Sequence, residues 1–209
     1  YYFFAAFRVR EETGAAQVQF SVPTGNFGDI LAGWYAKRMG LPIRRLVLAT
    51  NENDILARFF NTGVYAKGTV VPTVNPSMDI QVASNFERWL YYKVGEDPQA
   101  VARLMTQFAL EGRMEIPRDA KGQVDLEIVA GAADTKRTLG TIKRYHEKFK
   151  YLLDPHAAAG VFVAEQYNEL DEPMVCLATA HPAKFPDAIE DATGEDLAHH
   201  PMLDALKNA

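Results

Sequence analysis

The chain has little cysteine, no long apolar run and no excess of basic residues, and each shortage excludes a class of protein. Cys176 is the only cysteine among 209 residues, so neither a disulfide framework nor a cysteine-rich metal cluster is expected. No apolar run reaches the roughly 20 residues that span a bilayer, and we expect no signal peptide. A formal net charge of -5 argues against non-specific binding to nucleic acid or to a membrane surface. We therefore expect a protein of the reducing cytoplasm.

Hydrophobic residues make up 48% of the chain, enough for a sizeable core. Runs with strand composition alternate with helical segments, which predicts parallel strands joined by right-handed crossovers. These runs are 16–22, 44–50, 124–133 and 173–181. The fold class expected is a three-layer α/β/α arrangement with a mainly parallel sheet, and residues 1–209 are expected to form a single domain.

The helices carry recognisable start signals. Ser84 and Glu87 have the spacing of a capping box ahead of a mid-chain helical segment. Asp154 and Pro155 place a cap and a first-turn proline at the start of another helix, which we expect to run to about Leu170. The region between the second and third strand runs is expected to be helical.

The loop "PTGNFGD", residues 23–29, joins an apolar strand directly to a helix that we expect over 27–39. Unpaired N–H groups and the helix dipole make such a junction suitable for a phosphate group. We expect Gly25 and Gly28 to allow positive φ angles, while Asn26 tolerates the left-handed region. The loop lacks the Gly-Lys-Ser/Thr of a P-loop and the spacing of G-x-G-x-x-G. An ordinary strand–turn–helix connection is the alternative interpretation.

Two further strand runs end in polar residues, "LATNEND" and "CLATAHPAKF". Ligands of open α/β sheets bind at the carboxyl ends of the strands. There Thr179 would offer a neutral hydroxyl to a ring nitrogen without forcing the nitrogen to be protonated. The alternative is a helix N-cap ahead of "HPAKF".

Several long motifs together resemble the threonine synthase family, in the longer form found in bacteria and fungi. They are "SVPTGNFGDILAGWYAKRMGLPI", "LATNENDIL", "PSMDIQVASNFERWLY", "DPHAAAG" and "ATAHPAKFP". The likeness extends from Tyr1 to at least Pro186. The resemblance implies a fold-type II enzyme that uses pyridoxal 5'-phosphate (PLP). It implies conversion of O-phosphohomoserine and water to threonine and inorganic phosphate, and a dehydratase is the less favoured enzyme alternative.

The same resemblance implies roles for the residues of the loop and of the strand ends. Gly25, Asn26, Phe27 and Gly28 match the segment that holds the PLP phosphate. Thr179 matches the residue whose hydroxyl faces the pyridine nitrogen of PLP.

Three further residues are weaker candidates for contact with the substrate. Asn51 and Asp54 follow a strand at the same edge of the sheet, and Lys184 could meet a substrate phosphate as a point charge. For Lys184, an exposed helix lysine is the alternative interpretation.

The chain departs from the family pattern in one respect. The family's Schiff-base lysine stands in an "AFKD"-like motif upstream of the glycine loop, but the first lysine here is Lys37, which follows the loop. Because imine catalysis needs that amine, no catalytic residue is assigned in this chain. The uncapped helical pattern at residues 1–14 leads us to expect the C-terminal part of a two-domain enzyme, inactive without its N-terminal half.

A second class of function stays open, because a threonine-synthase-like chain can lose catalysis and bind a phosphate ligand or a partner protein. Among the other polar residues, His156 is a weak candidate for substrate contact, and Ser77 and Asp79 are read as a cap and a loop acid. Cys176 is interpreted as a small buried hydrophobe, and His146 as a histidine at the edge of the core. No histidine pair has the spacing of metal ligands, so no metal is predicted.

Overall fold

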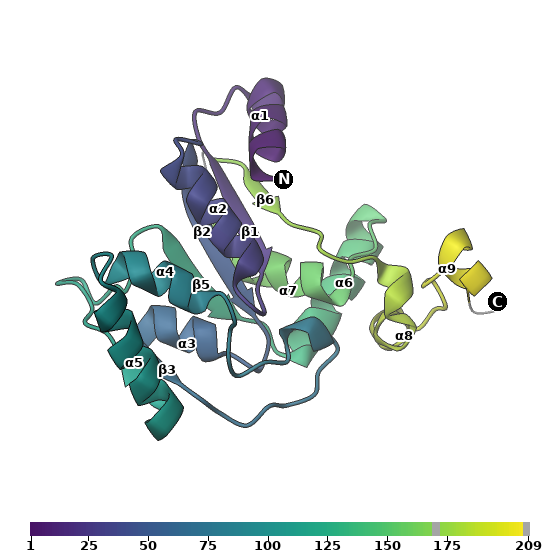
Figure 1. The fold of residues 1–209 in the computed structure, drawn as a ribbon. Coiled ribbons are helices and arrows are strands. Elements are labelled where there is room, and N and C mark those ends of the chain that lie inside the picture. The colour runs from purple at the N-terminus through teal and green to yellow at the C-terminus, as the bar shows by residue number, and fades with distance from the viewer. Residues whose placement is uncertain (169–171, 207–209) are drawn as a thin grey trace.

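The computed structural model describes residues 1–168 and 172–206. At its centre lies a four-stranded sheet in the order β5-β2-β1-β6, with every neighbouring pair parallel (Figure 1). The strands are β1 (Val18–Pro23), β2 (Ile43–Thr50), β5 (Ile128–Ala132) and β6 (Met174–Cys176). All four fall inside or next to the runs expected from composition, because β-branched and apolar residues fit a sheet that is buried on both faces.

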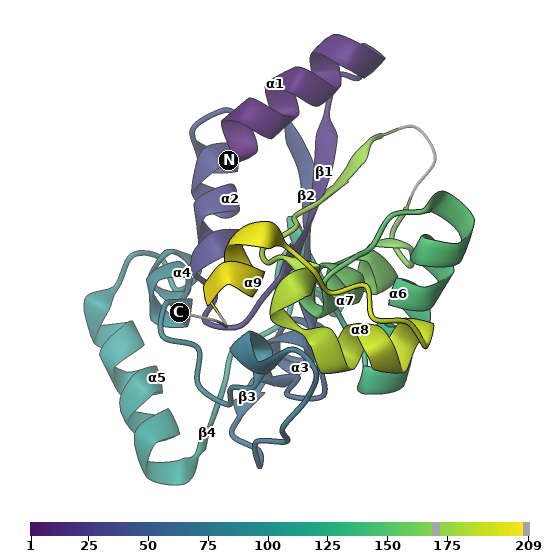
Figure 2. The ribbon, with the colours of Figure 1, turned by 90° about the vertical axis from the view of Figure 1, so that its right-hand side faces the viewer.

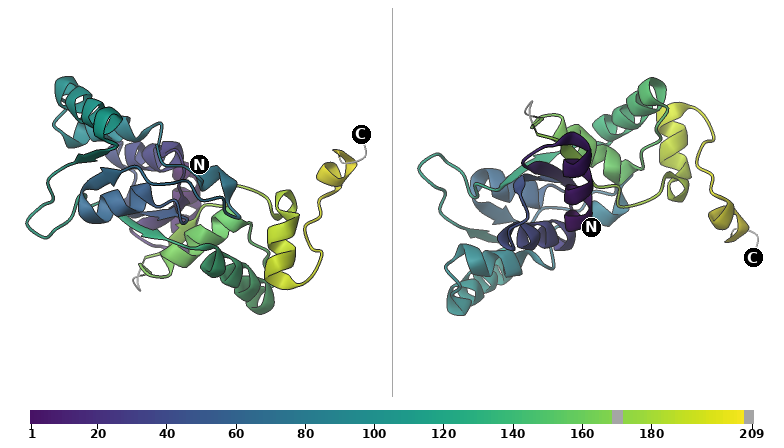
Figure 3. Two further views of the ribbon diagram at one scale, coloured as in Figure 1. Left: turned by 90° about the horizontal axis from the view of Figure 1, so that it is seen from below. Right: turned by 90° about the horizontal axis from the view of Figure 1, so that it is seen from above.

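Helices cover both faces of the sheet, which confirms the three-layer architecture (Figure 3). On one face lie α2 (Gly28–Arg38) and α3 (Ile55–Thr62), with α4 (Phe86–Lys93) packed against α2. On the other face α7 (Pro155–Ala164) packs directly on β1 and β2, and α6 (Thr135–Phe149) packs on α7.

The remaining elements lie around this three-layer body. Helix α1 stands at the end of the sheet away from α3, while α5 and α9 lie on opposite sides (Figures 1 and 2). No helix of the described residues is long and apolar enough to cross a membrane. The bounds are α1 (Tyr2–Thr13), β3 (Val64–Ala66), η1 (Pro76–Met78), α5 (Pro98–Glu111), β4 (Arg113–Glu115), η2 (Pro182–Lys184), α8 (Pro186–Thr193) and α9 (Pro201–Leu206).

Three expectations about local structure were wrong. The N-cap of α4 is Asn85 rather than Ser84, and neither a Ser84 nor an Asn85 side chain caps the helix. Helix α7 ends at Ala164, because the backbone leaves the helical path in turns after that residue. The region expected to be helical also contains a small antiparallel ladder between β3 and β4.

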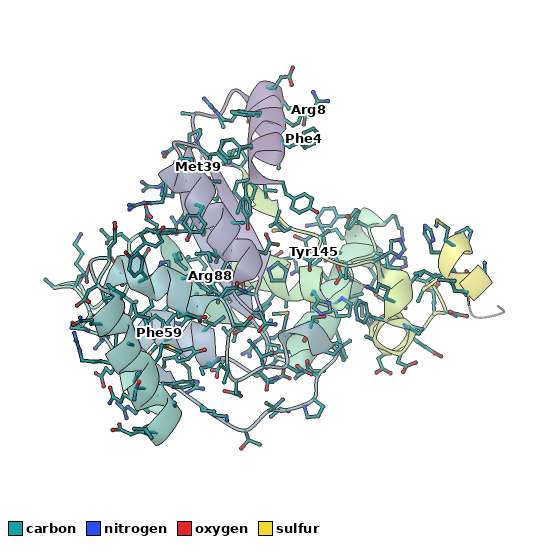
Figure 4. All side chains as sticks on the ribbon, in the orientation of Figure 1. Phe4, Arg8, Met39, Phe59, Arg88 and Tyr145 are labelled. Carbon is teal, nitrogen blue, oxygen red and sulfur yellow. The ribbon has the colours of Figure 1, made fainter. Side chains whose placement is uncertain are left out.

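The largest core cluster lies between the sheet and the helices of the α2 face. Its centre is an aromatic cluster in which neighbouring rings pack edge to face or stacked, as the ring quadrupoles favour. Phe59, labelled in Figure 4, comes from α3 and contacts several of the other rings. We define the aromatic cluster as Phe27, Phe59, Phe60, Tyr65, Phe86, Trp89 and Phe108.

Strand register places the carboxyl ends of β1 and its neighbours at one edge of the sheet. Pro23 pairs with Ala49 of β2, and Ser21 pairs with Cys176 of β6. Helix α7 approaches this edge closely, since the Ser21 hydroxyl donates to the Gly160 carbonyl at 2.7 Å. The glycine loop and the segment after β6 therefore leave the sheet side by side.

Candidate ligand-binding site

A cavity of about 290 Å³ opens at this edge of the sheet, beside the glycine loop. It brings together three of the residues expected from the sequence, Gly25, Thr179 and Lys184. Ser77 and His156 also line it. These residues come from the loop after β1, the segment after β6, η2, η1 and the start of α7, so the site depends on the whole parallel topology.

The glycine loop is shaped differently from the expectation. Its left-handed residue is Phe27, with φ of 66°, and neither Gly25 nor Gly28 has a positive φ. A bulky residue in this region is unfavourable by about 1–3 kcal/mol. Phe27 tolerates the conformation because its ring is buried in the aromatic cluster, 5.9 Å from the rings of Phe60 and Phe86.

Gly25 is needed for close approach and not for its backbone angles. A Cβ built on Gly25 would lie 2.3 Å from the carbonyl oxygen of Ser77. Only glycine lets these two segments touch without displacing the backbone. At Gly28 a Cβ would meet the Asn85 side chain at 3.3 Å, a contact that a side chain can relieve.

Backbone amides converge at the N-terminus of α2. The first helical bond runs from the Leu31 N–H to the Phe27 carbonyl. Within residues 1–168 and 172–206, the N–H groups of Gly25, Asn26, Phe27 and Gly28 donate no hydrogen bond. Unpaired amides and the positive end of the helix dipole favour an anion at this position.

The start of α4 holds the glycine loop from the outside. The backbone N–H and the side-chain amide of Asn85 both donate to the Asn26 carbonyl, at 3.1 and 3.0 Å. The Ser84 N–H reaches the Asn26 side-chain oxygen at 3.4 Å. The Asn85 side chain therefore stabilises the loop instead of capping its own helix.

Thr179 and Lys184 also line the cavity, and both are exposed. The N-cap of η2 is His181, whose ring accepts from the Ala183 N–H at 3.2 Å. The Thr179 hydroxyl is thus not used as a helix cap, and it remains available to a ligand.

Asn51 and Asp54 do not line this cavity. The Asn51 side chain is buried and donates to Thr73 at 2.8 Å and to Asp79 at 2.7 Å. Asp54 forms an ion pair with Arg58 at 2.7 Å on α3. Both residues follow β2 as expected, but their side chains are engaged elsewhere.

His156 is a cavity residue to which sequence reasoning gave little weight. It is 3% exposed, and its Nδ1 lies 3.1 Å from the Asp154 carboxylate. Its Nε2 is buried without a hydrogen-bond partner. The motif "DPH" carried a usable signal, because a capping aspartate two residues before a histidine can bind both the backbone and the imidazole.

Cys176 is half-buried at the sheet edge and lines a separate apolar hollow with Tyr145 and Val161. Burial raises the pKa of its thiol to about 11, and the negative charge of Glu165 acts in the same direction. The thiol stays protonated at neutral pH, which agrees with its interpretation as a small hydrophobe.

Comparison with known proteins shows what the chain is similar to. The crystal structure of PLP-bound threonine synthase from Brucella melitensis superposes with a TM-score of 0.92 at 47% sequence identity. The threonine synthase of Pseudomonas aeruginosa is 45% identical over 92% of this chain. Nearly the whole chain is similar to threonine synthases. Residues 157–209 match the family model described as "Threonine synthase, C-terminal".

The match covers only part of each relative. This chain spans 44% of the Brucella melitensis structure, all of the chain being aligned. It spans 41% of the Pseudomonas aeruginosa protein. It spans 42% of the threonine synthase of Schizosaccharomyces pombe, which is 40% identical over 90% of this chain. The chain thus spans about two fifths of the length of these relatives.

Proposed function

We propose that this chain contributes the cofactor-phosphate half-site of a PLP-dependent threonine synthase, which converts O-phosphohomoserine and water to threonine and inorganic phosphate. The observation that carries the proposal is the set of unpaired amides from Gly25 to Gly28 at the edge of a cavity that also holds Thr179. The similarity to threonine synthases supports it, including the similarity to the PLP-bound enzyme of Brucella melitensis.

The residues present fit the phosphate end of PLP. Four N–H groups that donate no hydrogen bond within the described residues provide donors, and Gly25 lines the cavity in which an anion could lie. No arginine or lysine of the loop is needed, because backbone donors and the dipole of α2 supply the positive potential.

Each residue of the half-site has a distinct task. Gly25, Asn26, Phe27 and Gly28 would hold the cofactor phosphate through their amides. Thr179 would place a neutral hydroxyl against the ring nitrogen, so that this nitrogen is not forced to carry a proton.

When bound, PLP supplies an electron sink for carbanion chemistry. Lys184 would contribute a positive charge at the mouth of the cavity, where it attracts the phosphate of the substrate. Asn51 and Asp54 have no direct role in this proposal, since their side chains are bound to neighbouring protein groups.

The reactive lysine must come from outside this chain, because none of its lysines precedes the glycine loop. We propose that residues 1–209 form one α/β domain of a two-domain enzyme and that the N-terminal half of the same polypeptide supplies the amine. The test uses the protein encoded by the natural reading frame that contains this chain.

Borohydride reduction in the presence of PLP, followed by peptide mapping, should trap one lysine in that protein, at a position outside residues 1–209. Phosphate release from O-phosphohomoserine should accompany the labelling. A stoichiometric adduct on a lysine within residues 1–209, competed by inorganic phosphate, would contradict the proposal. Binding of PLP without any phosphate release would favour a non-catalytic phosphate-binding protein instead.

A further inference from the structure

A single carboxylate organises the polar residues next to the cavity. Oδ1 of Asp79 accepts hydrogen bonds from the Thr73 hydroxyl at 2.6 Å, from Asn51 at 2.7 Å and from Asn53 at 3.0 Å. Its Oδ2 accepts from the Thr73 N–H at 2.9 Å. These four donors are neutral, so the carboxylate is held by hydrogen bonds that its charge strengthens.

The same network fixes segment 71–79 to the loop after β2 and to the start of α7. Asn53, just after β2, donates to the Val71 carbonyl at 2.8 Å and accepts from the Val71 N–H at 2.8 Å. The Asn75 side chain donates to the Pro155 carbonyl at 3.0 Å, at the start of α7. Asn51, Asn53 and Asn75 are all buried. The segment is therefore attached to the protein at several points along its length.

Segment 71–79 forms one wall of the candidate site. Ser77 and Met78 line the cavity, and the Ser77 carbonyl is the group that sits against Gly25. Asp79 lies directly after them, and its N–H donates to the Pro76 carbonyl at 3.1 Å. The position of the Ser77 carbonyl over the glycine loop thus depends on the anchoring of Asp79.

We propose that Asp79 is a positioning residue for the phosphate cradle: it holds the Ser77 wall against Gly25, so that the amides of the loop keep the spacing that a phosphate needs. This inference rests on the proposed function, because it assumes that the loop binds the phosphate of PLP. Asp79 does not line the cavity and acts only through Ser77 and the glycine loop.

The test compares two ligands that differ by the phosphate alone, PLP and pyridoxal, in the protein encoded by the natural reading frame. Asp79→Asn places an amide N–H₂ opposite one of the four donors. Thr73→Val removes one donor and leaves the carboxylate in place. Asp119→Asn is the matched control, since Asp119 is an exposed turn acid that also accepts backbone N–H groups, from Lys121 and Gln123.

The measured quantity is the ratio of the dissociation constants of pyridoxal and PLP. A loss of folded protein weakens both ligands equally, so this ratio responds to the cradle and not to stability. We expect the preference for PLP to fall about tenfold in Asp79→Asn. This is the change in affinity that corresponds to the loss of one hydrogen bond to a charged group, here a loop amide that no longer aligns with the phosphate. A smaller fall is expected in Thr73→Val and no change in Asp119→Asn.

An unchanged ratio in both Asp79→Asn and Thr73→Val would overturn the inference. If Asp79→Asn does not fold, Thr73→Val decides alone, and its ratio must fall for the inference to stand. A wild-type protein that binds pyridoxal as tightly as PLP would overturn the phosphate cradle itself, and with it the proposed function. The two failures are therefore distinguishable.

Discussion

Replacement of Gly25 by alanine tests the close contact on which the candidate site depends. The new Cβ would stand 2.3 Å from the Ser77 carbonyl oxygen, whereas ordinary van der Waals contact begins at 3.4 Å. Relief requires a shift of roughly 1 Å in one of two backbones, and overpacking of this kind costs about 1–3 kcal/mol. The Ser77 side cannot move freely, because Asp79 and Asn75 anchor its segment. We expect the free energy of unfolding to fall by about 2 kcal/mol.

The assay is urea denaturation of Gly25→Ala together with PLP titration of the folded variant. Gly140→Ala is the control, because Gly140 lies in the exposed part of α6 with nothing within 4 Å of a built Cβ. That variant should gain about 0.5–1 kcal/mol from the helix preference for alanine. A Gly25→Ala protein as stable as the wild type, with unchanged PLP affinity, would refute the reasoning.

Three further predictions follow from single contacts. Asp154→Ala removes the cap that accepts from the N–H groups of His156 and Ala157 and should lower the unfolding free energy by about 2 kcal/mol, measured by urea denaturation. Tyr65→Phe should reduce the loss of stability at alkaline pH. Burial raises the pKa of the Tyr65 hydroxyl from 10.0 to about 12. The contribution of this hydroxyl to the free energy of unfolding is therefore full below pH 10.0 and disappears as the pH rises to about 12. Unfolding curves across that pH range check this, and an unchanged slope would contradict it. In the protein encoded by the natural reading frame, and if the proposed function holds, Lys184→Gln should raise the KM for O-phosphohomoserine about tenfold while stability stays within about 0.5 kcal/mol. The exposed α6 residue Lys136, changed to Gln, is the control.

The elements that the sequence predicted are those specified by local pattern. The β-branched runs became strands, and Asp154 caps α7 as its Asp-Pro signal indicated. The β3–β4 ladder was missed because each strand has only three residues, and each needs a partner far along the chain to form at all. Strand order was equally unreadable, since it depends on which crossovers pack together.

In the candidate site too, features set by local sequence were predicted and features set by distant contacts were not. The junction of strand, glycine loop and helix at residues 23–29 was readable from the sequence, and anion binding by this loop stays a prediction. The sequence could not show why residue 25 must be glycine, because the Ser77 carbonyl that excludes a Cβ there is distant along the chain. The left-handed residue was also misplaced: Phe27 adopts that conformation only because tertiary packing of its ring offsets the backbone strain.

Phe27 links the backbone of the glycine loop to the aromatic cluster. Its backbone N–H is one of the unpaired amides of the glycine loop, while its ring packs on Phe60 of α3 and on Phe86 and Trp89 of α4. A phosphate that orders the amide also restricts rotation of the backbone that carries this ring. Amide hydrogen exchange in α3 and α4 should therefore slow as the ligand is added, although neither helix lines the cavity.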